Sequence, residues 1–301
     1  MPSGTITKGI GGFYYVASED GIYECKARGI FRKNEMTPLT GDQVEFSITD
    51  PGLKTGSIDR ILDRSSLLIR PAVANVNQLV AVIAARSPDP DLLLLDKLLV
   101  TAEKNEMKAI LCINKTDLDT DGGRKLLYKT YSDAGYEVLE TSSRENRGFE
   151  ELKAALNGRI SVFAGQSGVG KSTLLNRVMN TMMMKTGSLS DKIDRGKHTT
   201  RHAELISLED GGYVVDTPGF SSFELSGLEY TELQHYFPEF GRYIPNCRFK
   251  GCSHVSEPDC GVKQAVADGQ ISEGRYGRYV ELFTLLKQED EMKYKKGKGK
   301  G

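Results

Sequence analysis

The sequence predicts a multidomain α/β protein with a small β-barrel at its N-terminus and a helical region around a cysteine cluster at its C-terminus. Residues 1–70 contain short alternating strands, residues 71–225 alternate apolar strands with amphipathic helices, and residues 226–301 hold the clustered cysteines. A chain of 301 residues has room for two or three domains. We therefore expect one domain in each of the three segments.

The composition is that of a globular protein with no strong overall electric field. Hydrophobic residues make up 39% of the chain and charged residues 27%, and the net charge is -1, so any surface that binds nucleic acid must be local. No stretch approaches the ~20 apolar residues that cross a membrane. The first residues lack the apolar core of a signal peptide. These features predict a cytoplasmic protein that does not enter membranes.

In the first domain, four segments alternate as half-buried strands do: 12–18, 21–29, 41–48 and 55–62. Their length and glycine-rich punctuation favour a five-stranded barrel of the OB-fold type, which offers a face for nucleic acid. Another kind of small β-domain is the alternative.

The second domain alternates strands and helices, which predicts a mainly parallel sheet. A buried strand over 77–85 precedes an amphipathic helix over 90–105. Further strand and helix segments follow at 108–117, 122–135, 136–143, 148–158 and 160–180, before a hairpin within 203–219.

The segment 165–172, GQSGVGKS, has the spacing of a phosphate-binding loop between an apolar strand and a helix. Gly165, Gly168 and Gly170 let backbone N–H groups turn toward an anion at the helix N-terminus. Lys171 is expected to reach the β- and γ-phosphates, and the Ser172 hydroxyl to bind Mg²⁺. The other residues of this loop expected to contact nucleotide are Gln166, Ser167, Val169 and Thr173.

The motif Asn-Lys-x-Asp at 114–117 ends another apolar strand and predicts guanine recognition. The carboxylate of Asp117 can accept hydrogen bonds from N1–H and the 2-amino group of guanine, both of which adenine lacks. Asn114 is expected to brace the loop, and Lys115 to lie over the base.

The next strand ends in Thr141, Ser142 and Ser143, whose small size suits backbone contact with the guanine O6. A plain turn at the end of the strand is the alternative.

Downstream, Asp216 and Gly219 belong to the motif DTPG. We expect Asp216 to hold Mg²⁺ through a water and the N–H of Gly219 to sense the γ-phosphate. Between the loops, a threonine of the segment 195–202 should ligate Mg²⁺ with GTP bound. Thr200 is favoured over Thr199.

These motifs occur in rotated order, because the guanine motif precedes the phosphate-binding loop. Parallel strands present their following loops at one edge, so a circular permutation leaves the site intact in space. The loop after Asp216 then leads directly into the C-terminal domain. A further hypothesis is that GTP state acts on that domain through Gly219.

Phe220 occupies the position where many GTPases have the glutamine that orients the attacking water. His198 is the preferred replacement, ahead of His202, and an exposed loop residue without that role is the alternative. The residues expected to act in catalysis are Lys171, His198, Thr200 and Gly219. Without the glutamine, slow intrinsic turnover is expected.

Cys247, Cys252, His254 and Cys260 have the spacing C-x₄-C-x-H-x₅-C. Three thiolates and one imidazole fill a tetrahedral zinc shell with no open position, which predicts a structural site. A disulfide or isolated buried thiols are the alternatives. Cys25 and Cys112 lie in predicted strands and are expected to be core residues.

The order and combination of these motifs resemble one bacterial family, the ribosome small-subunit-dependent GTPase A, over essentially the whole chain. The resemblance implies an OB-fold, a permuted GTPase domain and a zinc-binding domain. It also implies GTP hydrolysis stimulated by the 30S subunit, binding to 16S rRNA in late maturation of that subunit, and guanosine tetraphosphate as a further ligand. We expect the protein to be a monomer.

The charges allow such RNA contacts, because residues 242–301 hold twelve Lys and Arg against eight Asp and Glu. Residues 293–301 form a Lys/Gly tail that is expected to be disordered. The main alternative function is a GTP-gated protein-binding switch that does not act on the ribosome. A GTPase acting on tRNA or in metal delivery has less support, because no second active site or metal-transfer loop is visible.

Overall fold

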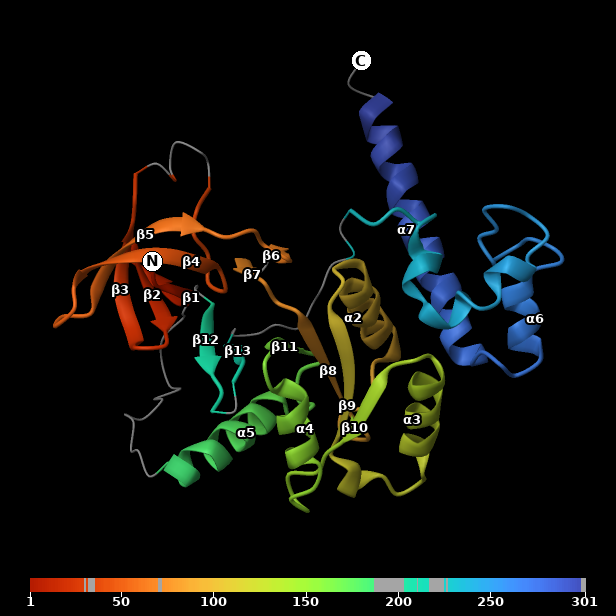
Figure 1. Ribbon diagram of the computed structural model, residues 1–301. Coiled ribbons are helices and arrows are strands. Elements are labelled where there is room, and N and C mark those ends of the chain that lie inside the picture. The colour runs from red at the N-terminus through yellow and green to blue at the C-terminus, as the bar shows by residue number, and fades with distance from the viewer. Residues whose placement is uncertain are drawn as a thin grey trace.

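The computed structural model describes residues 1–29, 31, 36–69, 72–186, 203–209, 211–216, 225 and 227–298. Figure 1 shows a barrel of N-terminal strands, a central sheet with helices, and a helical C-terminal part on the other side of the sheet from the barrel. Among the described residues, no helix has the length and apolar character needed to span a bilayer.

Five strands close into the N-terminal barrel in the order β1-β2-β3-β5-β4, which confirms the predicted barrel. Strands β3 and β5 pair in parallel, and the other neighbours are antiparallel. Inward residues form a separate apolar core that includes Val16, Cys25 and Phe46. The strands are β1 (Ser3–Ile10), β2 (Phe13–Ser18), β3 (Gly21–Ala27), β4 (Gln43–Asp50) and β5 (Thr55–Ile61).

Two elements of this part are not indicated by the sequence pattern. One is β1, where Gly4 and Gly9 weaken the apolar alternation. Gly4 is needed there, because a Cβ would lie 2.4 Å from the Ala17 carbonyl oxygen of β2. The other is a short hairpin of β6 (Leu67–Ile69) and β7 (Ala72–Ala74).

The central sheet has six strands in the order β10-β9-β8-β11-β13-β12. All neighbouring pairs are parallel except β12 with β13 at the edge, which form the predicted hairpin. The mainly parallel α/β sheet is therefore confirmed. The strands are β8 (Gln78–Ala84), β9 (Lys108–Asn114), β10 (Glu137–Glu140), β11 (Ile160–Ala164), β12 (Glu204–Ser207) and β13 (Tyr213–Asp216).

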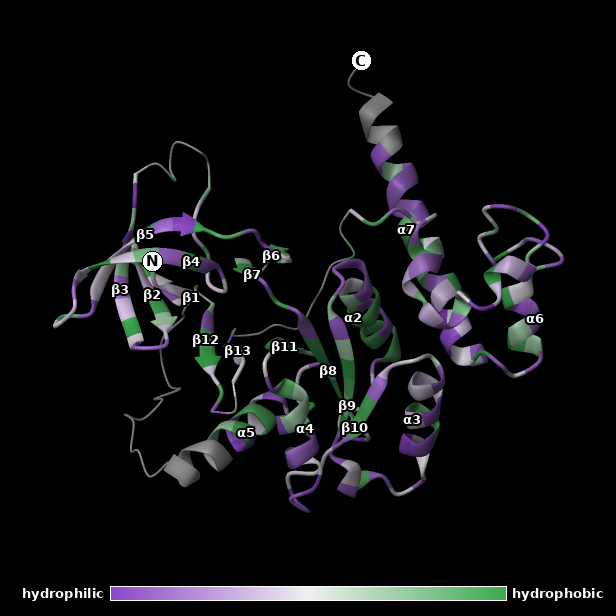
Figure 2. Cartoon of the chain, viewed as in Figure 1, coloured by the Kyte–Doolittle hydropathy of each residue, from purple (hydrophilic) through white to green (hydrophobic). Residues whose placement is uncertain are grey.

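Helices cover both faces of this sheet. Strand β8 alternates its side chains between two cores, so that Leu79 and Ile83 face α2 (Leu92–Lys104) and α3 (Gly123–Asp133). The alternate residues Val80, Val82 and Ala84 face α4 (Phe149–Leu156) and α5 (Lys171–Thr186). In Figure 2 the central strands are hydrophobic along much of their length, whereas α3 is largely hydrophilic.

The C-terminal part consists of three short 3-10 helices and two α-helices around an aromatic core. Phe237, Phe240 and Tyr279 pack with ring centroids 4.8 to 5.3 Å apart. Helix α7 continues to Lys298, so the expectation of a disordered tail is wrong for residues 293–298. The helices span Leu233–Tyr236, Pro238–Phe240, Ile244–Asn246, α6 (Gly261–Ala267) and α7 (Glu273–Lys298).

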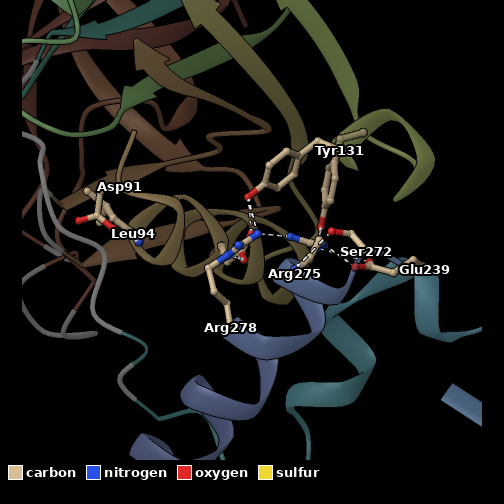
Figure 3. Close-up of polar contacts among 9 residues, drawn as sticks. Asp91, Leu94, Tyr131, Glu239, Ser272, Arg275 and Arg278 are labelled. Carbon is tan, nitrogen blue, oxygen red and sulfur yellow. Dashed lines mark hydrogen bonds and ion pairs between the residues drawn. The ribbon is translucent and has the colours of Figure 1, made fainter. Parts of the chain in front are cut away.

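A buried ionic network joins the C-terminal part to the sheet domain (Figure 3). The guanidinium of Arg275, 1% exposed, donates to Asp96 Oδ1 of α2 at 2.6 Å and also pairs with Glu239. Arg278 pairs with the second oxygen of Asp96, and the Tyr131 hydroxyl of α3 donates to Oδ1 at 2.9 Å. The network therefore ties α7 to both helices on that face of the sheet.

The barrel contacts the sheet domain at its edge strand β12. Lys8 Nζ lies 3.2 Å from Glu204 Oε2, and the Thr40 hydroxyl donates to the Ala203 carbonyl at 3.1 Å. The barrel thus adjoins the residue that directly follows the segment 187–202.

Candidate functional site

The loops predicted to bind nucleotide meet at one edge of the central sheet. Five of its strands are parallel, so the loops after them lie on the same side. These loops carry the segments 114–117, 140–143 and 165–172, and Asp216 ends β13 at the same edge. The rotated order along the chain therefore gives a single site in space.

The loop between β11 and α5 depends on glycines. The φ angles of Gly165, Gly168 and Gly170 are +142°, +81° and +99°, a region that other residues rarely adopt. A Cβ on Gly165 would lie 2.1 Å from the Val82 carbonyl oxygen, and one on Gly170 would lie 2.5 Å from Asn114 Nδ2. The loop is thus packed tightly on its neighbours at the N-terminus of α5, where anions bind.

Lys171, the first residue of α5, lies across this loop. Its ammonium donates to the carbonyl oxygens of Gly165 at 2.6 Å and Gln166 at 2.9 Å. Partial burial lowers the pKa of Lys171. A bound phosphate would raise this pKa again by favouring the charged ammonium, so the local electrostatics favour an anion here.

Asn114 connects three loops of the site. The residue is 2% exposed, and its amide Nδ2 donates to the Val169 carbonyl at 2.8 Å. Its Oδ1 accepts from the Thr141 hydroxyl at 3.0 Å. The predicted bracing role thus has a structural basis, since one side chain binds the phosphate loop and the loop after β10.

Lys115 is held against the phosphate loop. Its φ is +57°, and its ammonium donates to the Gly168 carbonyl at 2.7 Å and to the Ser87 carbonyl. The turn after β8 that carries Ser87 is a wall of the site that the sequence analysis missed. No motif marks this turn, and only the position of β8 beside β9 and β11 brings it here.

Asp117 and Ser142 lie in direct contact. The Ser142 hydroxyl donates to Asp117 Oδ1 at 2.6 Å. This hydrogen bond joins the loop after β9 to the loop after β10 and orients the Asp117 carboxylate. Nearby, Ser143 Oγ is buried and has no hydrogen-bond partner within the described part of the chain, and the same holds for Gln166 Oε1 of the phosphate loop. Orphaned polar atoms of this kind fit a site that is completed by a ligand.

Several predicted contacts are accessible to a ligand. Ser167 of the phosphate loop is exposed, as are Ser172 and Thr173 at the start of α5, so these residues are accessible to phosphate and Mg²⁺. Asp216 is half-buried at the end of β13. The remaining predicted residues of this site lie outside the described residues: His198, Thr199, Thr200, His202, Gly219 and Phe220.

The four predicted metal ligands come together in the C-terminal part. The ligand atoms of Cys247, Cys252, His254 and Cys260 lie within 4.8 Å of one another. Bond lengths of about 2.3 Å to sulfur and 2.05 Å to nitrogen put tetrahedral ligand atoms about 3.8 Å apart for S···S and about 3.5 Å for S···N. The Sγ atoms of Cys247 and Cys260 lie 3.9 Å apart, and His254 Nδ1 lies 3.5 and 3.3 Å from them.

This geometry supports a metal site and contradicts the disulfide alternative. A disulfide needs two sulfurs about 2.05 Å apart, and all five cysteines are free. Burial lowers the pKa of His254, which favours the neutral imidazole that binds metals. Cys25 and Cys112 are buried core residues as predicted, and burial raises the pKa of each thiol to about 11.

Partners around the cluster orient its loop. The Gln234 amide oxygen lies 2.9 Å from His254 Nε2. It can accept a hydrogen bond from the Nε2–H group, which leaves Nδ1 unprotonated and free to bind a metal. From α7, the hydroxyls of Tyr276 and Tyr279 donate to the carbonyls of His254 and Ser253 at 2.7 Å each. No motif predicts these residues, because they lie outside the cysteine motif in sequence and reach it only in the folded chain.

Comparison with known families finds two matches along the chain. The model of the RsgA GTPase family matches residues 61–226, and that of the RsgA N-terminal domain matches residues 3–56. The small ribosomal subunit biogenesis GTPase RsgA of Ruminiclostridium cellulolyticum is 56% identical over 298 residues, covering 98% of this chain and 97% of that protein. The RsgA protein of Alkaliphilus metalliredigens is 49% identical over 96% of this chain and 99% of its own.

Solved structures agree with this result. The crystal structure of YjeQ from Thermotoga maritima matches with a TM-score of 0.82 at 41% identity, covering 95% of this chain and 98% of that one. That of YloQ, described as a circularly permuted GTPase, has the same TM-score at 40% identity and covers 96% of each chain. The family resemblance and the permuted order predicted from the motifs are confirmed.

Proposed function

The chain belongs to the RsgA family of GTPases, and from this premise we propose that it binds the 30S ribosomal subunit and hydrolyses GTP to GDP and phosphate during late maturation of that subunit. The observation that carries the proposal is the convergence of the guanine motif, the loop after β10 and the phosphate loop through the side chain of Asn114. We also place the domain boundaries after residues 70 and 225.

In this proposal, the residues of the converging loops divide the nucleotide among them. Asp117 accepts the hydrogen bonds of guanine N1–H and the 2-amino group, and Lys115 lies over the base. The loop 165–172 encloses the phosphates, and Lys171 neutralises charge on the β- and γ-phosphates. Ser172, Thr200 and Asp216 hold Mg²⁺, which supplies further charge neutralisation when bound. The remaining nucleotide contacts are Asn114, Thr141, Ser142, Ser143 and Thr173.

Hydrolysis requires a group that orients the attacking water, because Phe220 has no polar side chain to do so. His198 takes this role, and the Gly219 N–H contacts the γ-phosphate. Turnover is slow until the 30S subunit binds and fixes these groups for catalysis. The enzyme then acts as a timer for a maturation step.

The metal cluster holds one zinc ion with a structural role. Cys247, Cys252, His254 and Cys260 fill all four tetrahedral positions, so no position remains for a substrate. The loop has few apolar residues of its own, and the metal supplies much of its folding free energy.

The barrel and the zinc domain contact 16S rRNA in this proposal. Basic residues of the C-terminal part provide phosphate affinity that does not depend on sequence, and a five-stranded barrel offers a nucleic-acid face. The protein acts as a cytoplasmic monomer, and guanosine tetraphosphate competes with GTP for the guanine site.

One alternative function keeps the GTP site but replaces the ribosome by a protein partner. A zinc domain can also serve as a platform for proteins. The salt dependence of partner binding separates the two, because RNA binding weakens steeply as salt rises.

The test of the proposed function is GTP hydrolysis by the purified protein alone, with 30S subunits, and with 50S subunits. We expect strong stimulation by 30S subunits only, and its loss in Lys171→Ala. An unchanged rate with both subunits would contradict the ribosomal proposal and favour the protein-switch alternative.

A further inference from the structure

Two arginines outside every nucleotide motif bridge the two loops that would meet the guanine base. One loop follows β9 and contains Asp117, and the other follows β10 and contains Ser142. The bridging residues are Arg124 of α3 and Arg147 in the segment before α4. Neither arginine is expected to touch the base in the proposed site.

Arg124 joins the loops from the side of α3. Its Nε lies 3.1 Å from Asp119 Oδ2, and its terminal nitrogen pairs with Glu140. Asp119 lies two residues after Asp117, and its side chain is only 3% exposed. Without the guanidinium, the buried Asp119 carboxylate would lose its cationic partner, and the two loops would carry facing carboxyl groups with no cation between them.

Arg147 joins the same loops from the other side. Its guanidinium donates to the Thr116 hydroxyl at 2.6 Å. Its backbone exchanges two hydrogen bonds of 3.1 Å with Ser142, which closes the loop 142–147 on itself. The Thr116 hydroxyl in turn donates to the Thr141 carbonyl at 3.1 Å, so Arg147 strengthens a contact that already crosses between the loops.

The position of the Asp117 carboxylate depends on these bridges. Asp117 lies between Thr116 and Asp119, the two residues that the arginines hold. Its partner Ser142 lies between Glu140 and Arg147. The hydrogen bond of 2.6 Å between Ser142 and Asp117 exists only while the two loops keep this spacing.

We propose that Arg124 and Arg147 are positioning residues for guanine recognition, which hold the Asp117 carboxylate in line with N1–H and the 2-amino group of the base. The inference rests on the proposed GTP site. It deepens that proposal by assigning part of the base specificity to residues outside the site. Two hydrogen bonds to one carboxylate demand accurate alignment, whereas one hydrogen bond tolerates a shift of the loop.

Inosine nucleotides separate this role from a general effect on folding or phosphate binding. Inosine keeps N1–H and O6 but lacks the 2-amino group, so it makes one hydrogen bond fewer to Asp117. The dissociation constants of GDP and inosine diphosphate are measured for Arg124→Met, Arg147→Met and the wild type. We expect each substitution to weaken GDP binding by about tenfold, and to weaken inosine diphosphate binding much less.

Lys129→Met is the matched control, because Lys129 lies on α3 with a 72% exposed side chain and pairs with Asp133 one turn later, away from both loops. It should leave both dissociation constants unchanged. Arg147→Met carries the decisive result, since the Arg147 side chain is 47% exposed and its replacement leaves no buried charge unpaired. Arg147→Lys, which keeps a donor, should recover part of the preference for GDP.

An equal loss of affinity for both nucleotides, or an unchanged ratio in Arg147→Met, would overturn the positioning role. A wild-type protein that does not distinguish GDP from inosine diphosphate would instead contradict the proposed guanine site itself. The two failures are therefore distinguishable in one experiment.

Discussion

Among single residues, Asp117 has the most specific proposed role. Its hydrogen-bonding chemistry predicts that substitution by asparagine changes the preferred base from guanine to xanthine. Asp117→Asn replaces one acceptor oxygen with an N–H₂ donor, which opposes the 2-amino group of guanine. Xanthine has an oxygen at that position and accepts this donor. We expect GTP affinity to fall by at least about 100-fold and xanthosine triphosphate to become the better ligand.

Competition binding with both nucleotides measures this exchange, with Asp133→Asn as a control on an exposed residue of α3. The guanine role of Asp117 is wrong if the Asn variant keeps the wild-type preference.

The conformation of Gly165 predicts that a side chain at this position disrupts the phosphate loop. Its φ of +142° and the distance of 2.1 Å from an ideal Cβ position to the Val82 carbonyl oxygen leave no room for a side chain. Gly165→Ala must move the loop or β8, at a cost of about 2 kcal/mol or more. We expect a lower melting temperature together with loss of GDP binding.

Gly158→Ala is the matched control for backbone strain. Gly158 also has positive φ, +69°, but nothing lies within 4 Å of its Cβ position. It should destabilise the fold by about 1 kcal/mol and leave GDP binding intact. Equal effects of the two substitutions would show that the contact with Val82 is unimportant.

Whether the role of a single residue can be predicted from the sequence depends on how close its partners are along the chain. Asn114, Lys171 and Asp117 can be predicted because each belongs to a short motif whose spacing reflects chemistry. Arg124, Arg147 and Gln234 cannot, because each acts on residues 5 to 31 positions away through contacts that only the folded chain creates. Arg275 and Asp96 are 179 positions apart, and no local pattern connects them.

At the scale of elements, the sequence predicts strands and helices wherever the apolar period is strong. Strand β8 is clear in the sequence because it is a continuous apolar run that is buried at every position. Helices α2 and α4 are clear because their apolar positions recur with the period of 3.6 residues of a helix. The hairpin of β6 and β7 is missed because three residues are too few to show a period. Helix α7 extends into the Lys-rich tail, since residues such as Lys287, Glu289 and Met292 favour helix.

The loop of the metal cluster yields a prediction of its own. Cys252→Ser removes one of four ligands, and Cys252 is only 3% exposed. We expect zinc content to fall from about one ion per chain to near zero. The region 247–260 should then become sensitive to protease, while the sheet domain still binds GDP because its core is separate.

Metal analysis and limited proteolysis check this result, and Cys25→Ser in the barrel serves as a control thiol. Retention of one zinc ion in Cys252→Ser would contradict the four-ligand site.

At the scale of the whole molecule, the ionic network around Asp96 determines how the C-terminal part is attached. Within the described residues, its buried polar contacts with the sheet domain include those on α2 and α3, at Asp96 and Tyr131. Arg275 also packs its guanidinium over the rings of Phe237, Tyr131 and Tyr136, at 4.7 to 5.3 Å from their centroids.

Asp96→Asn tests the strength of this attachment. Asp96 is fully buried and is the shared partner of Arg275 and Arg278. The substitution removes the negative charge that both guanidiniums contact, while Arg275 keeps its pair with Glu239. Breaking a buried ion pair from one side costs about 3 kcal/mol or more.

The contacts of Asp96 lie on α3 and α7, so basal GTP hydrolysis and zinc content should stay at wild-type levels. Calorimetry should show the C-terminal part unfolding in a separate transition at lower temperature. Asp133→Asn, which breaks only an exposed pair with Lys129, should change stability by less than about 1 kcal/mol. A single unshifted transition in Asp96→Asn would mean that the aromatic core and α2 contacts hold the two parts together without the charges.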